Sequence, residues 1–339
     1  MHHQEAVDGE PATSLELLGR SGKRLLELYL IYHYITVVAP SFPSESGTSL
    51  PIYSHQAGRL SFEHDCLLNA ILAVSSLHIA QEVAPDHIPF TIRRHDFKNL
   101  HQVYLQCALS HQRQALPSLS AATIEALALT SILLSIAALR LGASSPAIPY
   151  RPPTSYLQLS LGIRTIITTA QTLSPLPPIL SHLLFADNIS YRLDSHDVAA
   201  LYDPSNIPPK FLPILTFNAS HLSPSDPTSN STFIPTLSLL SSIHLAFTRG
   251  EPPYQLSRRI TSFASLAPPL FLSLLTAAHP CALVIFAHYI AMTVPLVEHY
   301  WFYRDVAQNE ITGIDSILPE DWKWALSWPR KTCERCVVD

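Results

Sequence analysis

The chain has 339 residues and a formal net charge of −5, and only 14% of its residues are charged against 47% hydrophobic. A chain so poor in charge must bury much of its length, which fits one large domain or two small ones. The negative charge and the lack of a clustered Lys/Arg patch argue against direct nucleic-acid binding. The 29 Pro and 9 Gly favour helices with stiff connectors over a sheet with many tight turns.

In the first half of the chain, apolar residues recur at three- and four-residue spacing, which predicts amphipathic helices. We expect residues 1–14 to be disordered. Helices are expected over 15–38, 61–80, 88–116, 121–141, 156–173 and 179–191. The helix over 88–116 is the most polar and should lie on the outside. The helix over 121–141 is apolar on all sides and should be central.

In the second half, residues 203–235 are rich in Pro, Ser, Thr and Asn, which predicts an extended surface loop. Helices are expected over 237–248, 254–264, 269–278 and 281–303, with a kink in the last at Pro295. Residues 331–339 are expected to form a tail.

The stretch from Ile260 to Val297 contains no Asp, Glu, Lys or Arg. His279 and Pro280 interrupt it, so a buried helix pair is favoured over a membrane span. Strand-like alternation is not evident, and the predicted fold class is all-α, a multi-helix domain over residues 15–330.

Motifs for catalysis or metal binding are scarce. The chain has five Cys, an odd number that suggests reduced thiols. Its single Cys-x-x-Cys motif, Cys333 to Cys336, supplies two ligands, whereas a zinc site needs about four. We therefore expect no metal and no cofactor. The polar segment 187–197 is interpreted as a local helix cap, with an acid/base site or pocket mouth as the alternative.

Three blocks carry a family resemblance: Leu60–Ala80 (LSFEHDCLLNAILAVSSLHIA), Tyr156–Ala170 (YLQLSLGIRTIITTA) and the C-terminal stretch His279–Pro329, which ends in Leu-Pro-x-x-Trp and Trp-Pro. In order and spacing they resemble the regulatory domain of fungal zinc-cluster transcription factors of the sterol-uptake-control type. The six-cysteine DNA-binding cluster of that family has no counterpart, because no Cys precedes Cys66. Arg304-Asp305-Val306 stands where the family often has a Gly-Trp pair.

The resemblance implies an all-α regulatory domain of the nucleus or cytoplasm, without its own DNA-binding part. Its implied role is to sense a hydrophobic small molecule, such as a sterol or terpenoid, or to contact a partner regulator or a second copy. The candidate ligand-binding residues follow the C-terminal helix and its aromatic end: His288, Tyr289, Met292, Glu298, Tyr300 and Trp301. A polar group in so apolar a helix needs a ligand or a buried hydrogen bond, and both interpretations of His288 remain open.

Two alternatives remain. The chain could be an enzyme of fungal secondary metabolism that cyclises or isomerises a terpenoid or polyketide, using His288, Tyr289, Glu298 and the polar segment 187–197. The other is a zinc cluster encoded upstream of this sequence.

Overall fold

The computed structural model describes residues 19–43, 51–84, 87–88, 94–144, 149–173, 175–185, 202–221 and 228–335. Within these ranges the fold is all-α, and they contain no strand, which confirms the predicted fold class. The α-helices are α2 (Gly19–His33), α3 (Ala57–Ser61), α4 (Asp65–Glu82), α5 (Arg94–Ala115), α6 (Ile124–Ser144), α7 (Thr154–Gln171), α8 (Pro178–Phe185), α10 (Leu212–His221), α11 (Thr228–Arg249), α12 (Pro253–Leu266), α13 (Pro269–Thr276), α14 (Pro280–Ala291), α15 (Val306–Ile317) and α16 (Ser327–Arg335).

Shorter helical turns connect them. Two are π-helical, η1 (Tyr34–Val38) and η3 (Ile52–Gln56). The others are 3-10 turns: η2 (Ala39–Ser41), η5 (Leu116–Ser118), η7 (Pro204–Asn206), η8 (Val294–Leu296), η9 (Trp301–Tyr303) and η10 (Glu320–Leu326).

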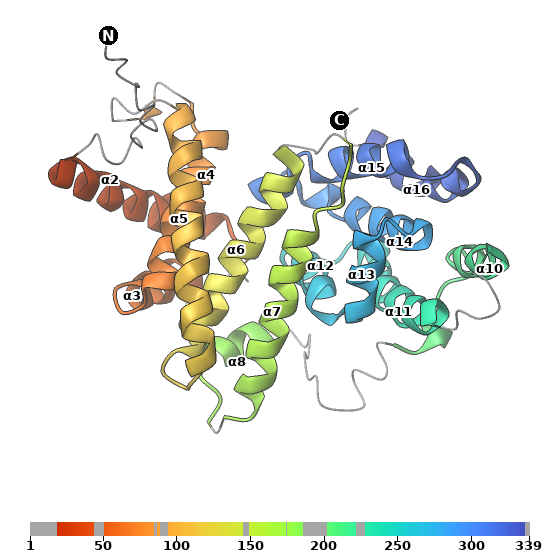
Figure 1. Ribbon diagram of the computed structural model, residues 1–339, viewed down its shortest axis with the longest axis horizontal. Helices are drawn as coiled ribbons and strands as arrows, with labels where there is room; N and C mark the ends of the chain where they lie inside the picture. The colour runs from red at the N-terminus through yellow and green to blue at the C-terminus, as the bar shows by residue number, and fades with distance from the viewer. Residues whose placement is uncertain are drawn as a thin grey trace, which may run out of the picture.

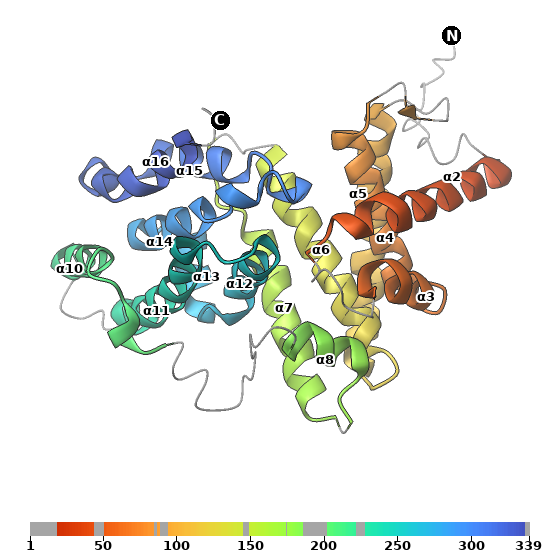
Figure 2. The ribbon, with the colours of Figure 1, turned by 180° about the vertical axis from the view of Figure 1, so that it is seen from behind.

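The helices form two groups around a central pair (Figures 1 and 2). Helices α2 to α5 lie on one side, α10 to α16 lie on the other, and α6 and α7 run between them. Helix α6 packs against α4, α5, α7 and α15. Its all-round apolar sequence therefore meets protein on several sides, which agrees with the predicted central position.

The largest hydrophobic cluster draws on both groups, from Tyr34 in η1 to Cys333 in α16, and includes most of α14. Burying each large apolar side chain contributes roughly 1.5–3 kcal/mol, so this cluster is the main source of stability. Helix α6 is the one helix in the described ranges that is long and apolar enough to cross a membrane by itself. In its candidate stretch, Ile124–Gly142, 78% of the apolar segment is buried inside the protein.

Proline sets the start of the C-terminal helices. Pro253, Pro269 and Pro280 open α12, α13 and α14. The first turn of a helix has no partner for its N–H groups, so a residue without N–H costs nothing there. Gly250 ends α11 with a φ of 66°, a left-handed conformation that glycine adopts without strain.

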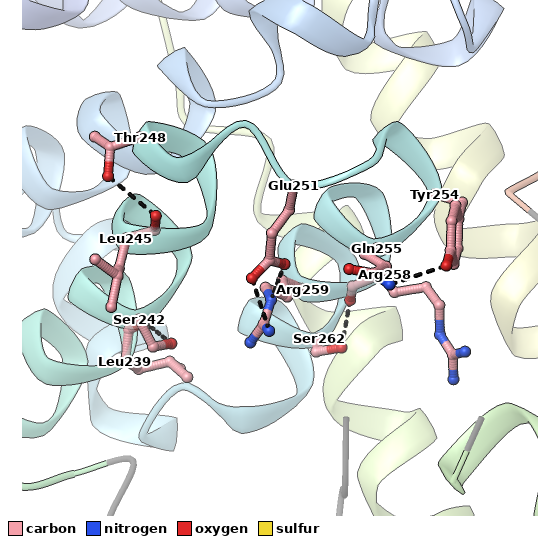
Figure 3. Close-up of polar contacts among 10 residues, drawn as sticks. All are labelled: Leu239, Ser242, Leu245, Thr248, Glu251, Tyr254, Gln255, Arg258, Arg259 and Ser262. Carbon is pink, nitrogen blue, oxygen red and sulfur yellow. Dashed lines mark hydrogen bonds and ion pairs between the residues drawn. The ribbon is translucent and has the colours of Figure 1, made fainter. Parts of the chain in front are cut away.

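An ion pair closes the turn between α11 and α12 (Figure 3). The guanidinium of Arg259 donates to both carboxylate oxygens of Glu251, at 2.7 and 3.2 Å. The neighbouring Arg258 donates to the carbonyl of Leu183 at 2.7 Å and so ties α12 to α8. Both arginines of this basic pair therefore have structural contacts.

The structure differs from the loop expected over 203–235, because α10 and the first two turns of α11 occupy much of it. Hydroxyl groups in this part of α11 bond within the helix: Thr236, just after the expected loop, donates to the carbonyl of Thr232 at 2.7 Å. A Ser or Thr that bonds the carbonyl four residues back can be buried in a helix. Phe233 and Leu237 then supply the apolar face.

The single kinked helix expected over 281–303 is also wrong. Helix α14 ends at Ala291, and Pro295 lies in the separate 3-10 turn η8. Because Pro295 falls in the first positions of that turn, its missing N–H breaks no helical hydrogen bond. The chain then turns through η9 into α15, so the aromatic residues 300–303 lie on a connector rather than on the helix.

Candidate functional site: the aromatic junction

The six residues predicted to bind a ligand do not line one common site, because they contact different parts of the protein. The ring of His288 stacks on Trp328 with centroids 5.3 Å apart, and its Nε2 lies 2.9 Å from the carbonyl oxygen of Ala325. The adjacent Tyr289 instead donates to the carbonyl of Ile260 at 2.9 Å, toward α12. Met292 is fully buried, whereas Glu298 is exposed.

Tyr289 belongs to a buried hydroxyl network. Its hydroxyl lies 2.9 Å from that of Tyr156 on α7, and Tyr303 and Ser257 form a similar pair at 3.0 Å. Burial raises the pKa of Tyr289 well above its usual value, so its hydroxyl stays neutral and bonds only as a neutral group. These bonds hold α7, α12 and α14 together.

Tyr300 and Trp301, in contrast, belong to a cluster of rings that joins the two helix groups. We call this cluster the aromatic junction. Its members come from the end of α2, η1, the residue after η2, α4, and η9 with the residue before it: His33, Tyr34, Phe42, His78, Tyr300, Trp301 and Phe302. Neighbouring rings lie with their centroids 5.0 to 6.4 Å apart. The ring of His78 lies 5.0 Å from that of His33 and 5.0 Å from that of Trp301. The contacts continue from Trp301 to Phe302 at 6.0 Å, from Phe302 to Phe42 at 6.1 Å and from Phe42 to Tyr34 at 6.4 Å. Because Tyr34 follows His33 in the chain, the series of contacts closes on itself.

Three polar hydrogens at or next to the aromatic junction have no acceptor among the residues that the structure describes. The hydroxyl of Tyr34, the indole N–H of Trp301 and the hydroxyl of Ser75 are buried and have no hydrogen-bond partner in the described residues. Ser75 precedes His78 by three residues on α4, so the two share a helix face. A buried unpaired donor costs about 1–3 kcal/mol, and such groups need an acceptor from water or a ligand.

Two π-helical segments border the aromatic junction. Tyr34 opens η1, and Tyr53 in η3 packs its ring against Phe42 with centroids 5.1 Å apart. The segments η1 and η3 also contact each other. π-Helical turns are rare and are frequently found at functional sites.

The two histidines of the aromatic junction are neutral. Nε2 of His33 lies 3.1 Å from Nδ1 of His78, so one ring donates and the other accepts. Burial lowers the pKa of His33 to about 4 and that of His78 to about 3, with the nearby charge of Arg304 also acting on His78. Near neutral pH the aromatic junction therefore contains no charge of its own.

Charged residues form a rim one helical turn away. Arg140 of α6 lies 3.7 Å from Glu82 and donates to the carbonyl of Arg304 at 2.7 Å. Arg304 also pairs with Glu82, and Asp305 lies 3.8 Å from Arg140. Asp305 has a φ of 61°, so this connector adopts a left-handed turn to reach the rim. The rim fixes residues 304–305 against α4 and α6.

Other predicted features lie elsewhere. The polar segment 187–197 and Cys336 fall outside the described residues. In the ranges that the structure describes, no group of three or more His, Cys, Asp or Glu is arranged to hold a metal ion. A surface pocket of about 220 Å³ lies between α15 and α16, lined by residues that include Asp315 and Arg330, which is small for a drug-sized ligand.

Sequence reasoning missed the N-terminal share of the aromatic junction. The apolar spacing over residues 15–38 predicted one helix. Such spacing does not distinguish an α-helical turn from the π-helical turn that begins at Tyr34. A signal was present in the sequence, because Tyr34, Phe42 and Tyr53 are aromatic residues in and beside a Pro-rich connector. That signal does not identify the residues that these rings pack against, because Phe302, which contacts Phe42, is more than 200 residues away in the chain.

The fold and the aromatic junction thus define an all-α domain with buried, unpaired donors between two helix groups. No family model matches the chain. It is 24% identical over 329 residues to a Zn(2)-C6 fungal-type transcription factor of Gibberella zeae, covering 91% of this chain and 62% of the relative. It is 23% identical over 266 residues to the Zn(2)-C6 fungal-type transcription factor afumD of Aspergillus fumigatus, covering 78% of this chain and 66% of the relative. The chain spans less than two thirds of each relative, and the resemblance to fungal zinc-cluster transcription factors is confirmed.

Proposed function

We propose that the chain is a transcription-factor-like regulatory domain that senses a hydrophobic small molecule at the aromatic junction. The similarity to two curated fungal transcription factors over most of the chain supports the regulatory class. Small-molecule sites are mainly apolar and aromatic, with a few polar groups that fix the ligand's orientation. The aromatic junction has this composition.

The observation that carries the proposal is the set of buried donors without acceptors at Tyr34, Ser75 and Trp301. All three are O–H or N–H groups, so the matching ligand offers an acceptor, such as the hydroxyl or ketone oxygen of a sterol or terpenoid. The surrounding rings contact its apolar body. Neutral His33 and His78 make a charged ligand unfavourable there.

In this proposal, the position of the aromatic junction between the two helix groups couples ligand binding to their arrangement. The site contacts η1 and α4 in one helix group and the connector 300–305 in the other. A ligand that binds one arrangement of the groups better than another shifts the population between them. The charged rim around Glu82 and Arg140 then rearranges with residues 304–305.

In this proposal the domain supplies sensing and not base contacts, since its net charge is −5. A partner regulator or a second copy of the chain supplies the contacts with DNA that this domain does not make. The proposed location is the nucleus or the cytoplasm.

A reporter assay tests the regulatory role. The full chain is fused to a heterologous DNA-binding domain and activation segment, and reporter output is measured with and without added ergosterol or farnesol. We expect output to change with at least one of these lipids, and Tyr34→Phe to need about fivefold more lipid, or more, for the same response. An output indifferent to both, with partner-dependent output instead, would favour the protein-contact interpretation. Turnover of farnesol or ergosterol by purified protein would favour the enzyme.

A further inference from the structure

A second polar cluster surrounds Lys210, in the turn between η7 and α10. The ammonium nitrogen of Lys210 lies 4.9 Å from the ring centroid of Phe211 and 5.0 Å from that of Trp328 on α16. It also donates to Nε2 of His244 on α11. Three separate elements therefore converge on one exposed cation.

Among the described residues, no carboxylate pairs with this cation. In the ranges that the structure describes, the partners of Lys210 are His244 and the two aromatic rings. By comparison, Lys323 pairs with Glu320. Burial lowers the pKa of Lys210 to about 8, so most of the lysine is still charged near pH 7. A partly desolvated cation without a counter-charge is a favourable place for an anion.

His288 supplies a second unsatisfied group behind the cation. Its ring packs edge-on against Phe211 with centroids 5.3 Å apart, and it stacks on Trp328. Because Nε2 faces the carbonyl oxygen of Ala325, it carries the hydrogen, and Nδ1 is left as an acceptor. That Nδ1 is buried and has no partner in the described part of the chain.

We propose that Lys210, His244 and Trp328 form a binding site for the carboxylate of an apolar organic acid. The ammonium pairs with the carboxylate, the half-buried ring of Trp328 contacts the apolar body above the buried Phe211, and His288 Nδ1 accepts from a hydroxyl group if the acid has one. Aromatic walls favour a carboxylic acid over inorganic phosphate, which is strongly hydrated and offers them no apolar surface. This site is separate from the aromatic junction and does not depend on its function.

Calorimetric titration of the full chain at pH 7 tests the proposal, with 2-naphthoate and decanoate as probes and their amides as uncharged counterparts. We expect each acid to bind at least tenfold more tightly than its amide. Substituting Lys210→Met should weaken binding of the acids at least tenfold and leave the amides unchanged. The matched control, Lys323→Met, removes a lysine that has a carboxylate partner and should change neither.

Circular dichroism and the melting temperature verify that the variants are folded, and Lys210→Gln repeats the test with a polar side chain. Three results would overturn the proposal: equal affinity for acid and amide, no saturable binding of either acid at millimolar concentration, or wild-type binding of the acids by both Lys210 variants. Equal weakening by Lys323→Met would show a general charge effect and would also reject the site.

Discussion

Glu310 on α15 should make the stability of the protein fall as pH rises. Its side chain is buried, with 4% of the residue exposed, and it accepts a 2.5 Å hydrogen bond from the hydroxyl of Tyr150. Burial raises the pKa of Glu310 from 4.5 to about 7. The folded state therefore keeps the proton over a range in which the unfolded chain has lost it.

The size of the effect follows from the two pKa values. Below pH 4.5 the carboxyl group is protonated in both states, and its contribution to stability is fully present. Between pH 4.5 and 7 the unfolding free energy falls by about 1.4 kcal/mol per pH unit, and above pH 7 the loss levels off. Between pH 5 and pH 8 the group should cost roughly 2–3 kcal/mol.

Urea unfolding of the wild type and Glu310→Gln at pH 5, 6, 7 and 8 isolates this contribution. All other titrating groups are shared, so they cancel in the difference between the two proteins. We expect the variant to gain roughly 2–3 kcal/mol relative to the wild type as pH rises from 5 to 8. A difference that stays constant across this range would show that Glu310 titrates normally and would refute the argument.

Three further substitutions test contacts at Tyr150, on α7 and in the charged rim. Gly313→Ala would place a Cβ 2.1 Å from the Tyr150 ring, so it should cost about 1–3 kcal/mol in urea unfolding. Gly162→Ala has no atom within 4 Å and should not destabilise α7, and an equal loss at both sites would contradict the contact. Arg140→Met removes the guanidinium that donates to the carbonyl of Arg304, while Glu82 keeps Arg304 as its partner, so it should cost about 1.5–3 kcal/mol, whereas a loss below about 1 kcal/mol would show that the rim adds little.

The helices were largely predictable because their signal is local. The spacing of apolar residues placed α4, α6, α7 and α12 close to their observed bounds. Pro295 shows the limit, because a proline predicts a disturbed helix but does not say whether the helix bends or ends. The hydroxyl-rich start of α11 shows another, since Ser and Thr suit a loop or a buried helix equally well until their neighbours are known.

The candidate site was predictable only on its C-terminal side. The four consecutive aromatic residues from Tyr300 to Tyr303 indicated a candidate site by their composition alone. Its partners Tyr34 and Phe42 are separated from it by more than 200 residues, and no local pattern encodes that contact. The stacking of His288 on Trp328 also joins two separate helices, α14 and α16, so local spacing does not encode it.

Ligand affinity of Tyr34→Phe tests the central claim most directly. The substitution keeps the ring and removes a buried hydroxyl that has no partner in the described residues. In the ligand-free protein the unfolding free energy should stay the same or rise, because an unpaired polar group is lost. Binding of the fluorescent sterol dehydroergosterol should weaken about fivefold or more, the value of one hydrogen bond. Trp324→Phe, at an exposed tryptophan, serves as the control and should bind as the wild type does. Equal affinity of Tyr34→Phe and the wild type, or no saturable binding by the folded wild type, would contradict a ligand site at the aromatic junction.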